Sequence, residues 1–414
     1  MPSMMTTLPP LSPEMQKQGE AMLNHLEQLI QKAGGHISFA HFMKHALYAQ
    51  DLGYYTSPLQ KFGETGDFVT APEISPLFAK TLARQFAAIL STMPEAAILE
   101  LGAGTGIFAK EVMTELKELQ ALPSQYYIFE ASPTLIARQK KVLETSCPQF
   151  FSRFNWLTEL PDHFQGIIFA NEWLDALPVH CFRIENKTVT ERCVTFKNKQ
   201  LTWKTVAPQT QALHKKVLAL MNHYAWPEGY ESEINLLLPR WIKTLAKLLD
   251  KGVLLFFDYG YEREEYYHPE RSCGTLRAYF QHRMHADPFL YPGLQDLTAH
   301  VDFTTVVEQA ISAGLDLAGY TTQQAFLIAC GIGDFANSFP TSQKAYRQNQ
   351  ALKLLLLPSE MGSLIKAVAF TKNWNEPLDG FSGGVKSCLQ PSPPHYRAKV
   401  EDKIISLPTS LKNP

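Results

Sequence analysis

Three glycines alternate with small residues at Gly102, Gly104 and Gly106, directly after the apolar run Ala97–Leu101 and before the helix-like pattern that begins at Ile107. This order predicts a strand, a tight turn and a helix. A glycine has no Cβ, so such a turn can lie flat against a ligand and adopt positive φ angles. The first amide N–H groups of the following helix are free to bind an acceptor. We interpret the segment as a nucleotide cradle, but the glycines alone do not identify the nucleotide.

Two acidic residues, Glu130 and Glu100, narrow the choice of nucleotide. Glu130 ends the predicted strand 125–130, 24 positions after Gly106, where a carboxylate can accept both hydroxyls of a ribose; the alternative is an ordinary surface glutamate. The glycine spacing differs from that of dinucleotide sites, and no P-loop lysine follows. Glu100 offers an acidic edge for an amino group. These features favour S-adenosylmethionine, with predicted contacts at Glu100, Gly102, Ala103, Gly104, Gly106, Glu130, Ala131 and Asn171.

Polar side chains also follow two later predicted strands. The run 166–170 leads into Asn171, Glu172 and Asp175, and the run 253–260 ends in Asp-Tyr-Gly. In an open α/β sheet the carboxyl ends of the strands open onto the ligand crevice. We therefore expect Asn171, Glu172 and Asp175 to lie where the chemistry occurs. The alternative is a solvated helix cap with Asp175 on its face.

The stretch 261–302 is rich in histidine and aspartate and includes His282, His285 and His300. That content suggests a metal site, but no His-x-x-x-His pair and no carboxylate triad spacing organises it. We therefore predict no metal and interpret the stretch as a substrate-facing arm.

The order of the predicted elements sets the domain organisation. We expect an N-terminal helical extension over 1–60, an α/β domain over 61–370 and a polar, loosely held tail over 371–414. Alternating β-type residues interrupt the strand–helix rhythm after Val179, which predicts inserted lobes at about 179–250 and 261–302. The second helix of the first lobe is expected to begin at Glu233.

The loop 61–75 precedes a helix start at Ser75 and Pro76, which have the types of a cap and a first-turn proline. The loop is polar, but it is poor in the residues that make up flexible linkers. It is either a surface connection or a lid in front of the cradle.

Composition excludes several classes of partner. The chain has 414 residues, a net charge of −2 and 19% charged residues, so no global basic field recruits nucleic acid or an anionic membrane. Its six cysteines form no Cys-x-x-Cys pair, which indicates reduced thiols. The first residues lack the features of a signal or transit peptide, and no apolar stretch reaches the roughly 18–20 residues that span a bilayer. We therefore predict a cytoplasmic protein. The oligomeric state stays open, a dimer included.

Several blocks together resemble the MidA-like family of class I methyltransferases, over about residues 36–370. They are 53–55 (GYY), 66–78 (GDFVTAPEISPLF), 98–106 (ILELGAGTG), 130–133 (EASP), 171–179 (NEWLDALPV), 258–260 (DYG), 274–276 (GTL) and 296–303 (DLTAHVDF). The resemblance implies a seven-stranded α/β sheet with inserted lobes. From mitochondrial members that help assemble respiratory complex I, it also implies methylation of a protein arginine. Trp173 departs from the small aliphatic residue more often found in the family, which puts the shape of the acceptor pocket in question.

Methyl transfer from a sulfonium needs in-line approach, so the enzyme contributes mainly positioning and a prepared acceptor. Carboxylates can hold the fork of a guanidinium bidentately. We therefore expect Glu172 and Asp175 to orient an arginine of a protein substrate, with Asp67 and His300 lining the site. Two alternatives are a non-catalytic assembly factor that retains the cofactor pocket and a methyltransferase for small molecules. The Asn-Pro-Pro-[Phe/Tyr] signature of many amine and amide methyltransferases is missing.

Overall fold

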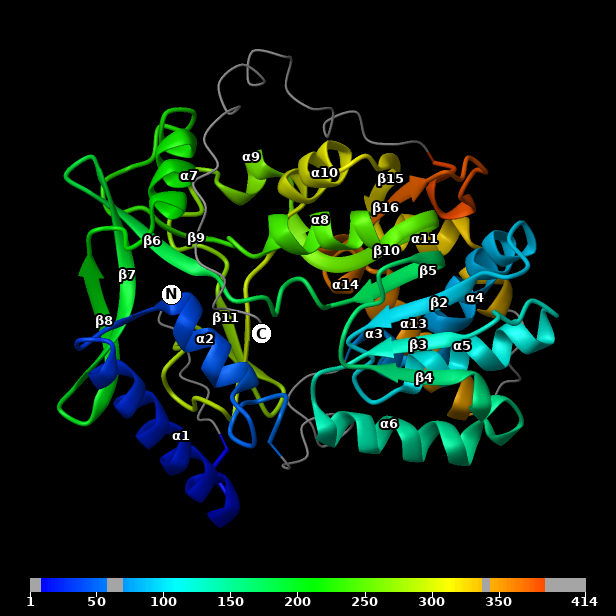
Figure 1. Ribbon diagram of the computed structural model, residues 1–414, viewed down its shortest axis with the longest axis horizontal. Helices are drawn as coiled ribbons and strands as arrows, with labels where there is room; N and C mark the ends of the chain where they lie inside the picture. Colours follow the sequence, from blue (N-terminus) through cyan, green and yellow to red (C-terminus); the bar gives the residue numbers. More distant parts are fainter. Residues whose placement is uncertain (1–8, 58–69, 337–342, 384–414) are drawn as a thin grey trace.

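The computed structural model describes residues 9–57, 70–336 and 343–383. Seven strands of its main sheet lie in the order β15, β16, β10, β5, β2, β3, β4, and a short eighth strand, β14, pairs with β10 (Figure 1). The strands are parallel except β16, which runs antiparallel to both of its neighbours. Their bounds are β2 Ala97–Leu101, β3 Tyr126–Phe129, β4 Phe154–Leu157, β5 Phe164–Asn171, β10 Leu249–Tyr261, β14 Val301–Asp302, β15 Asp316–Thr322 and β16 Ile365–Lys372.

Helices cover both faces of this sheet (Figure 1). On one face α4 (Pro76–Ser91) and α5 (Ile107–Glu118) pack against the strands, and on the other face α8 (Leu238–Leu248) and α10 (Phe303–Ser312) do so. Strand β2 is buried over its whole length because its side chains alternate between the two cores. The remaining helices are α3 Ala71–Ile74, α6 Pro133–Ser146, η1 Pro148–Arg153, α9 Arg263–Tyr266, α11 Gln323–Ala329, α12 Ile332–Ala336, α13 Gln343–Leu356, α14 Met361–Leu364 and η2 Asp379–Phe381.

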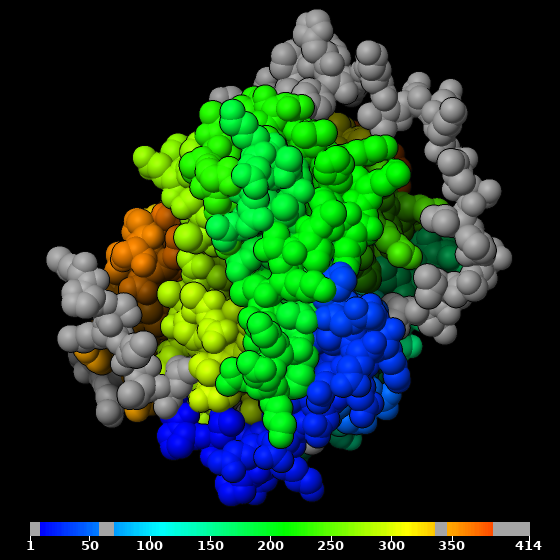
Figure 2. Space-filling view, turned by 90° about the vertical axis from the view of Figure 1, so that its left-hand side faces the viewer, coloured from blue at the N-terminus to red at the C-terminus, as the bar shows by residue number. Residues whose placement is uncertain are grey.

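A second, antiparallel sheet stands beside the first. It contains β1 (Ile37–Ser38), β7 (Thr188–Lys197), β6 (His180–Glu185) and β9 (Glu231–Ile234), and β8 (Gln200–Val206) pairs with β7. Helices α1 (Pro13–Lys32) and α2 (Phe39–Tyr48) share an apolar core with it, and α7 (Gln211–Met221) lies in another core with β6. Figure 2 shows this face, with the lobe in green and the N-terminal helices in blue below it. The N-terminal segment is thus part of the lobe's own packing.

One sequence-based expectation is wrong in this lobe. The helix predicted from Glu233 begins only at Leu238, because Glu231–Ile234 forms β9 beside β6. The side chain of Asn235 accepts a hydrogen bond from the Leu238 amide (2.9 Å), and Pro239 lies in the first turn of the helix. A polar acceptor followed by a first-turn proline is the ordinary chemistry of a helix start.

The stretch between β10 and α10 forms a small sheet of its own. Its strands lie in the order β12 (Arg283–His285), β11 (Arg277–Phe280), β13 (Asp296–Thr298). All its pairings are antiparallel, and Tyr279 of β11 lies opposite Asp296 of β13. This sheet brings a second carboxylate-bearing segment towards the main sheet.

The first part of the predicted tail is packed, which corrects the expectation of a loosely held segment from 371 onwards. Strand β16 extends to Lys372, and Trp374, Leu378 and Phe381 are buried in the main core. The ring of Phe381 packs against Phe326 of α11 at 5.2 Å between centroids. Spaced apolar side chains therefore hold 373–381 in place, and the rest of the tail, 384–414, lies outside the described residues.

None of the helices in 9–57, 70–336 and 343–383 is long and apolar enough to cross a bilayer. In the same ranges, no group of three or more His, Cys, Asp or Glu side chains is arranged to hold a metal ion.

Candidate active site

The glycine turn lies between β2 and α5 and has the backbone that its sequence predicts. Gly102, Gly104 and Gly106 have φ angles of +69°, +51° and +82°, the left-handed region that favours glycine. A Cβ on Gly102 would lie 2.7 Å from the ring of Trp173, and one on Gly106 would lie 3.3 Å from Gln139. A Cβ on Gly104 would meet nothing within 4 Å. The turn is therefore closed by side chains at both ends and open in the middle.

Glu130 is fastened to this turn by a residue whose role the sequence did not reveal. One Glu130 carboxylate oxygen accepts a hydrogen bond from the amide of Ser132 (2.9 Å) and the other from Gln139 Nε2 (3.2 Å). The same Gln139 nitrogen donates to the carbonyl of Gly104 (3.0 Å). Burial raises the pKa of Glu130, although these hydrogen bonds act to lower it. No local sequence pattern marks Gln139, because its contact with Gly104 spans 35 residues.

Glu100 lies inside the sheet layer. It is buried and accepts a hydrogen bond from the hydroxyl of Tyr126 on the neighbouring strand (2.8 Å). Burial, opposed by this bond and aided by the charge of Glu130, raises the pKa of Glu100 to about 8. Glu100 is therefore mostly protonated at neutral pH, and its carboxyl is engaged with the sheet as well as adjacent to the turn.

Glu172 follows β5 in a strained conformation. Its φ angle is +49°, and its amide donates to the carbonyl of Phe257 on β10 (2.8 Å). One carboxylate oxygen accepts from Asn171 Nδ2 (2.9 Å) and from the amide of Ala71 (3.3 Å). Burial first, then the charges of Asp296 and Glu73, raise the pKa of Glu172 to about 7. A non-glycine residue held in the left-handed region is often part of a functional site.

Asp258, at the end of β10, holds the loop that carries Glu172. One carboxylate oxygen accepts hydrogen bonds from the amides of Trp173 (3.0 Å) and Leu174 (2.7 Å), and the other accepts from the amide of Tyr259 (2.8 Å). Burial raises the pKa of Asp258 to about 8. Sequence reasoning saw only an acid at a strand end, because the amides it caps lie 84 and 85 residues away.

Asp175 completes the acidic cluster and is itself buried. Burial raises its pKa well above the ordinary value, and the negative charges of Asp258, Glu172 and Asp296 raise it further. The structure therefore brings Glu172 and Asp175 together, and it adds Asp258 and Asp296, which were not predicted as site residues.

The segment before α4 also reaches the site. Glu73 of α3 accepts a hydrogen bond from the hydroxyl of Thr105 in the glycine turn (2.8 Å), and Ala71 binds Glu172. Residues 71–73 of α3 therefore bridge the glycine turn and the loop that carries Glu172. Asp67, predicted to line the site, lies outside the described residues.

His300 lies among cations rather than among the carboxylates. Burial, together with Arg271, Arg277 and Lys366, lowers its pKa to about 4, so its ring is neutral at ordinary pH. The ring packs against the β10 side chains of Tyr259 (6.2 Å between centroids) and Tyr261 (4.9 Å). Tyr259, which packs against His300, is also close to Glu172 in electrostatic terms. Its pKa is raised first by burial and then by the charge of Glu172.

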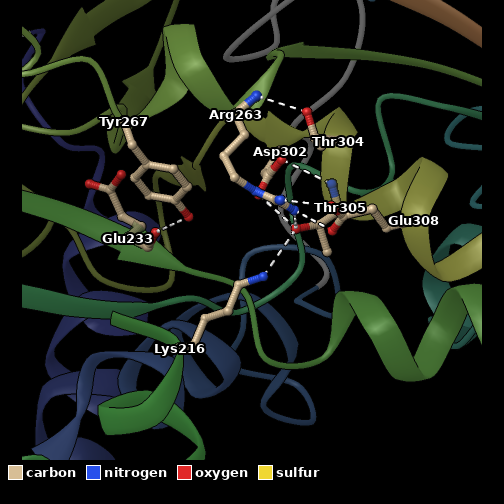
Figure 3. A network of polar contacts seen from close by, with 8 residues as sticks. All are labelled: Lys216, Glu233, Arg263, Tyr267, Asp302, Thr304, Thr305 and Glu308. Carbon is tan, nitrogen blue, oxygen red and sulfur yellow. Dashed lines mark hydrogen bonds and ion pairs between the residues drawn. The ribbon is translucent and has the colours of Figure 1, made fainter. Parts of the chain in front are cut away.

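A polar network fixes the segment that follows His300 (Figure 3). Arg263 binds the Glu308 carboxylate through both terminal nitrogens (2.8 and 2.5 Å), and its Nε lies 3.4 Å from Asp302. Its amide donates to the hydroxyl of Thr304 (2.9 Å). Lys216 of α7 reaches the same place, 3.5 Å from the hydroxyl of Thr305. The network joins α7 of the lobe, α9 and the start of α10.

The chain is similar to known proteins in sequence and in fold. The family model described as "putative S-adenosyl-L-methionine-dependent methyltransferase" matches residues 81–321. A crystal structure from Burkholderia thailandensis with S-adenosyl-homocysteine bound is 37% identical, covers 93% of this chain and 100% of that chain, and has a TM-score of 0.88. The mitochondrial protein arginine methyltransferase NDUFAF7 of Homo sapiens is 27% identical over 375 residues, 82% of this chain and 81% of that protein. Its Drosophila melanogaster homolog, also named mitochondrial, is 27% identical over 370 residues, 81% of each.

A glycine turn after β2, in a sheet whose seven main strands include the antiparallel β16, defines a class I S-adenosylmethionine-dependent methyltransferase. The chain belongs to the MidA-like family of these enzymes. The predicted fold class is confirmed, and so are the predicted cofactor, S-adenosyl-L-methionine, and the predicted class of enzyme.

The prediction of a cytoplasmic protein is wrong, because the curated relatives are named as mitochondrial proteins. Reduced cysteines and the lack of a long apolar run are features of proteins in any reducing compartment. They could not distinguish the cytosol from the interior of an organelle.

Proposed function

We propose that this methyltransferase modifies an arginine side chain of a protein, and that Glu172 and Asp175 hold the guanidinium. One observation carries the proposal: the buried carboxyl groups of Asp175 and Asp258 and the half-buried carboxyl group of Glu172 gather near the ends of β5 and β10. In the described part of the chain, no ion pair joins Glu172, Asp175 or Asp258 to a basic side chain. Buried carboxylates without a cationic partner suit a cationic substrate. The names of the curated relatives support arginine as that cation.

The cofactor fits the residues at the glycine turn. The space above Gly104 is open, and Asn171 Oδ1 is buried without a hydrogen-bond partner among the residues that the structure describes. We expect Gly102, Ala103, Gly104 and Gly106 to cradle the amino-acid end beside Glu100. Glu130 and Ala131 would bind the ribose, and Asn171 would supply its free oxygen. When bound, S-adenosylmethionine supplies an electrophilic methyl group.

The chain's own residues would prepare the acceptor. A guanidinium is planar and charged, so it must be held in one orientation and must give up one proton as its nitrogen becomes methylated. Glu172 can do both, because a carboxylate with a pKa of about 7 accepts hydrogen bonds and takes a proton near neutral pH. The amides bound by Asp258 keep the loop in place while it does so. His300, with its uncharged ring, would line the site together with Tyr259, against which it stacks.

Substitution of Glu172 tests this assignment. Glu172→Gln keeps the shape but removes the charge and the basic oxygen, so labelled methyl transfer from S-adenosylmethionine to proteins of a cell lysate should fall by about a hundredfold or more. The affinity for the cofactor, measured by calorimetry, should change little. The matched control is Glu144→Gln on the exposed face of α6, which should transfer normally.

Three results would contradict the proposal. Normal transfer by Glu172→Gln would remove the residue from the chemistry. Label in a small product alone would favour the small-molecule alternative. Cofactor binding by the wild type without any transfer would favour a non-catalytic docking role.

A further inference from the structure

Two tyrosines of the N-terminal segment reach the acidic cluster. Tyr48 is the last residue of α2, and Tyr55 lies in the turn that follows. Their rings stack with 5.4 Å between centroids and 27° between planes. The segment that carries them was expected only as a helical extension, so these rings are additional candidates for the site.

The hydroxyls of the pair are bound to the two segments that carry the carboxylates. Tyr48 donates to the carbonyl of Ala176 (3.1 Å), the residue after Asp175. Tyr55 donates to Asp296 Oδ1 (3.0 Å) on β13. The stacked pair therefore spans the gap between the loop after β5 and the small sheet.

Three carboxyl groups of the site affect the pKa of Tyr48. Its pKa is raised well above the ordinary value by burial first and then by the carboxylates of Asp296, Asp175 and Glu130. The hydroxyl of Tyr48 is therefore close enough to all three carboxyl groups for their charges to act on it. Its hydroxyl end is turned inwards, yet 37% of the residue stays exposed, so its ring is accessible to a substrate.

We propose that Tyr48 and Tyr55, with Asp296, form an aromatic wall that receives the cationic head of the acceptor and selects it against neutral side chains. The inference rests on the proposed function, because it takes the acceptor to be a cation. It adds residues of α2, the turn after it and β13 to the binding site.

The physical reason is the match between a stacked aromatic pair and a planar cation. A guanidinium stacks on an aromatic face and is attracted by its negative π surface. Asp296 adds a carboxylate at the hydroxyl end of Tyr55. A neutral group of the same shape gains the packing but loses the attraction to both.

Binding of two probes to the full chain with S-adenosyl-homocysteine present tests the wall. The probes are N-acetyl-L-arginine amide and its neutral isostere N-acetyl-L-citrulline amide, each titrated by calorimetry. The wild type should prefer the arginine probe. Tyr48→Ala should reduce that preference about three- to thirtyfold, whereas Tyr48→Phe, which keeps the ring, should reduce it less than about threefold. The control is Tyr346→Ala, an exposed tyrosine on α13, 65% exposed, which should leave the preference unchanged.

The outcomes distinguish the proposed cationic acceptor from the proposed aromatic wall. If the wild type binds both probes equally, the cationic acceptor is wrong and this inference falls with it. If the wild type prefers arginine but Tyr48→Ala keeps that preference, with the melting curve and the affinity for S-adenosyl-homocysteine unchanged, the aromatic wall alone is wrong. If Tyr48→Ala does not fold, Tyr48→Leu replaces it, and an undiminished preference there would equally overturn the wall.

Discussion

At the scale of single residues, the candidate site is defined by carboxyl groups whose pKa values burial raises to near neutral pH. Glu172 has a pKa of about 7 and Asp258 of about 8, in each case because burial disfavours the charged form. Asp258 still accepts three amide hydrogen bonds, which tie it to the loop and to its own strand. A cationic substrate would favour the ionised forms of both groups, so substrate binding should release protons.

The raised pKa of Glu172 predicts a pH dependence. Below a pH of about 7 its carboxyl is protonated and cannot take the acceptor's proton, so kcat/KM for the acceptor should rise with pH and level off above that value. Initial rates with labelled cofactor across this range measure it. Glu144→Gln should keep the wild-type profile. A wild-type profile that stays flat through neutrality would remove Glu172 as the base.

At the scale of elements, sequence reasoning succeeded where apolar runs and caps are local. Strand β2, the turn and α5 lie where the glycine pattern predicts, and the N-cap of α4 is Ser75, as expected from Ser75 and Pro76. It failed where pairing joins distant segments. Strand β1 pairs with β7, and Ile37 lies opposite Val194, which no local pattern reveals. The same limit hid Tyr48 and Gln139, since their partners lie far along the chain.

The open middle of the glycine turn gives a prediction at this scale. Gly104→Ala should cost about 1 kcal/mol of stability, because its φ of +51° strains an alanine, and it should weaken cofactor binding at least about tenfold, because the Cβ enters the cradle. Gly34→Ala is the matched control: Gly34 has a φ of +80° and open space, but it lies after α1. Thermal unfolding and calorimetry should show a similar loss of stability in both and weaker binding only in Gly104→Ala. Equal cofactor affinities would contradict the cradle.

At the scale of the whole molecule, two sheets and one helix contribute to the candidate site. The main sheet supplies the glycine turn and Glu172, the small sheet supplies Asp296, and helix α2 beside the second sheet supplies Tyr48. The Arg263 network in Figure 3 holds the lobe helix α7 and the start of α10 together. The lobes are thus part of the site's construction.

Breaking that network should destabilise the fold. Arg263→Met leaves two carboxylates, Asp302 and Glu308, without their partly buried cation, so the free energy of unfolding should fall by about 3 kcal/mol. Arg84→Met is the control, because its partner Asp334 is 71% exposed, and it should cost less than about 1 kcal/mol. Urea unfolding of both variants measures the difference. Equal losses would show that the network adds no more stability than a surface ion pair.

The chemical identity of the methylated group tests the central claim most directly. The enzyme is incubated with methyl-labelled S-adenosylmethionine and lysate, and the labelled protein is hydrolysed and its amino acids are separated. We predict label in methylated arginine with the wild type and almost none with Glu172→Gln. Label in another amino acid or only in a small molecule, or cofactor binding with no transfer at all, would contradict the account.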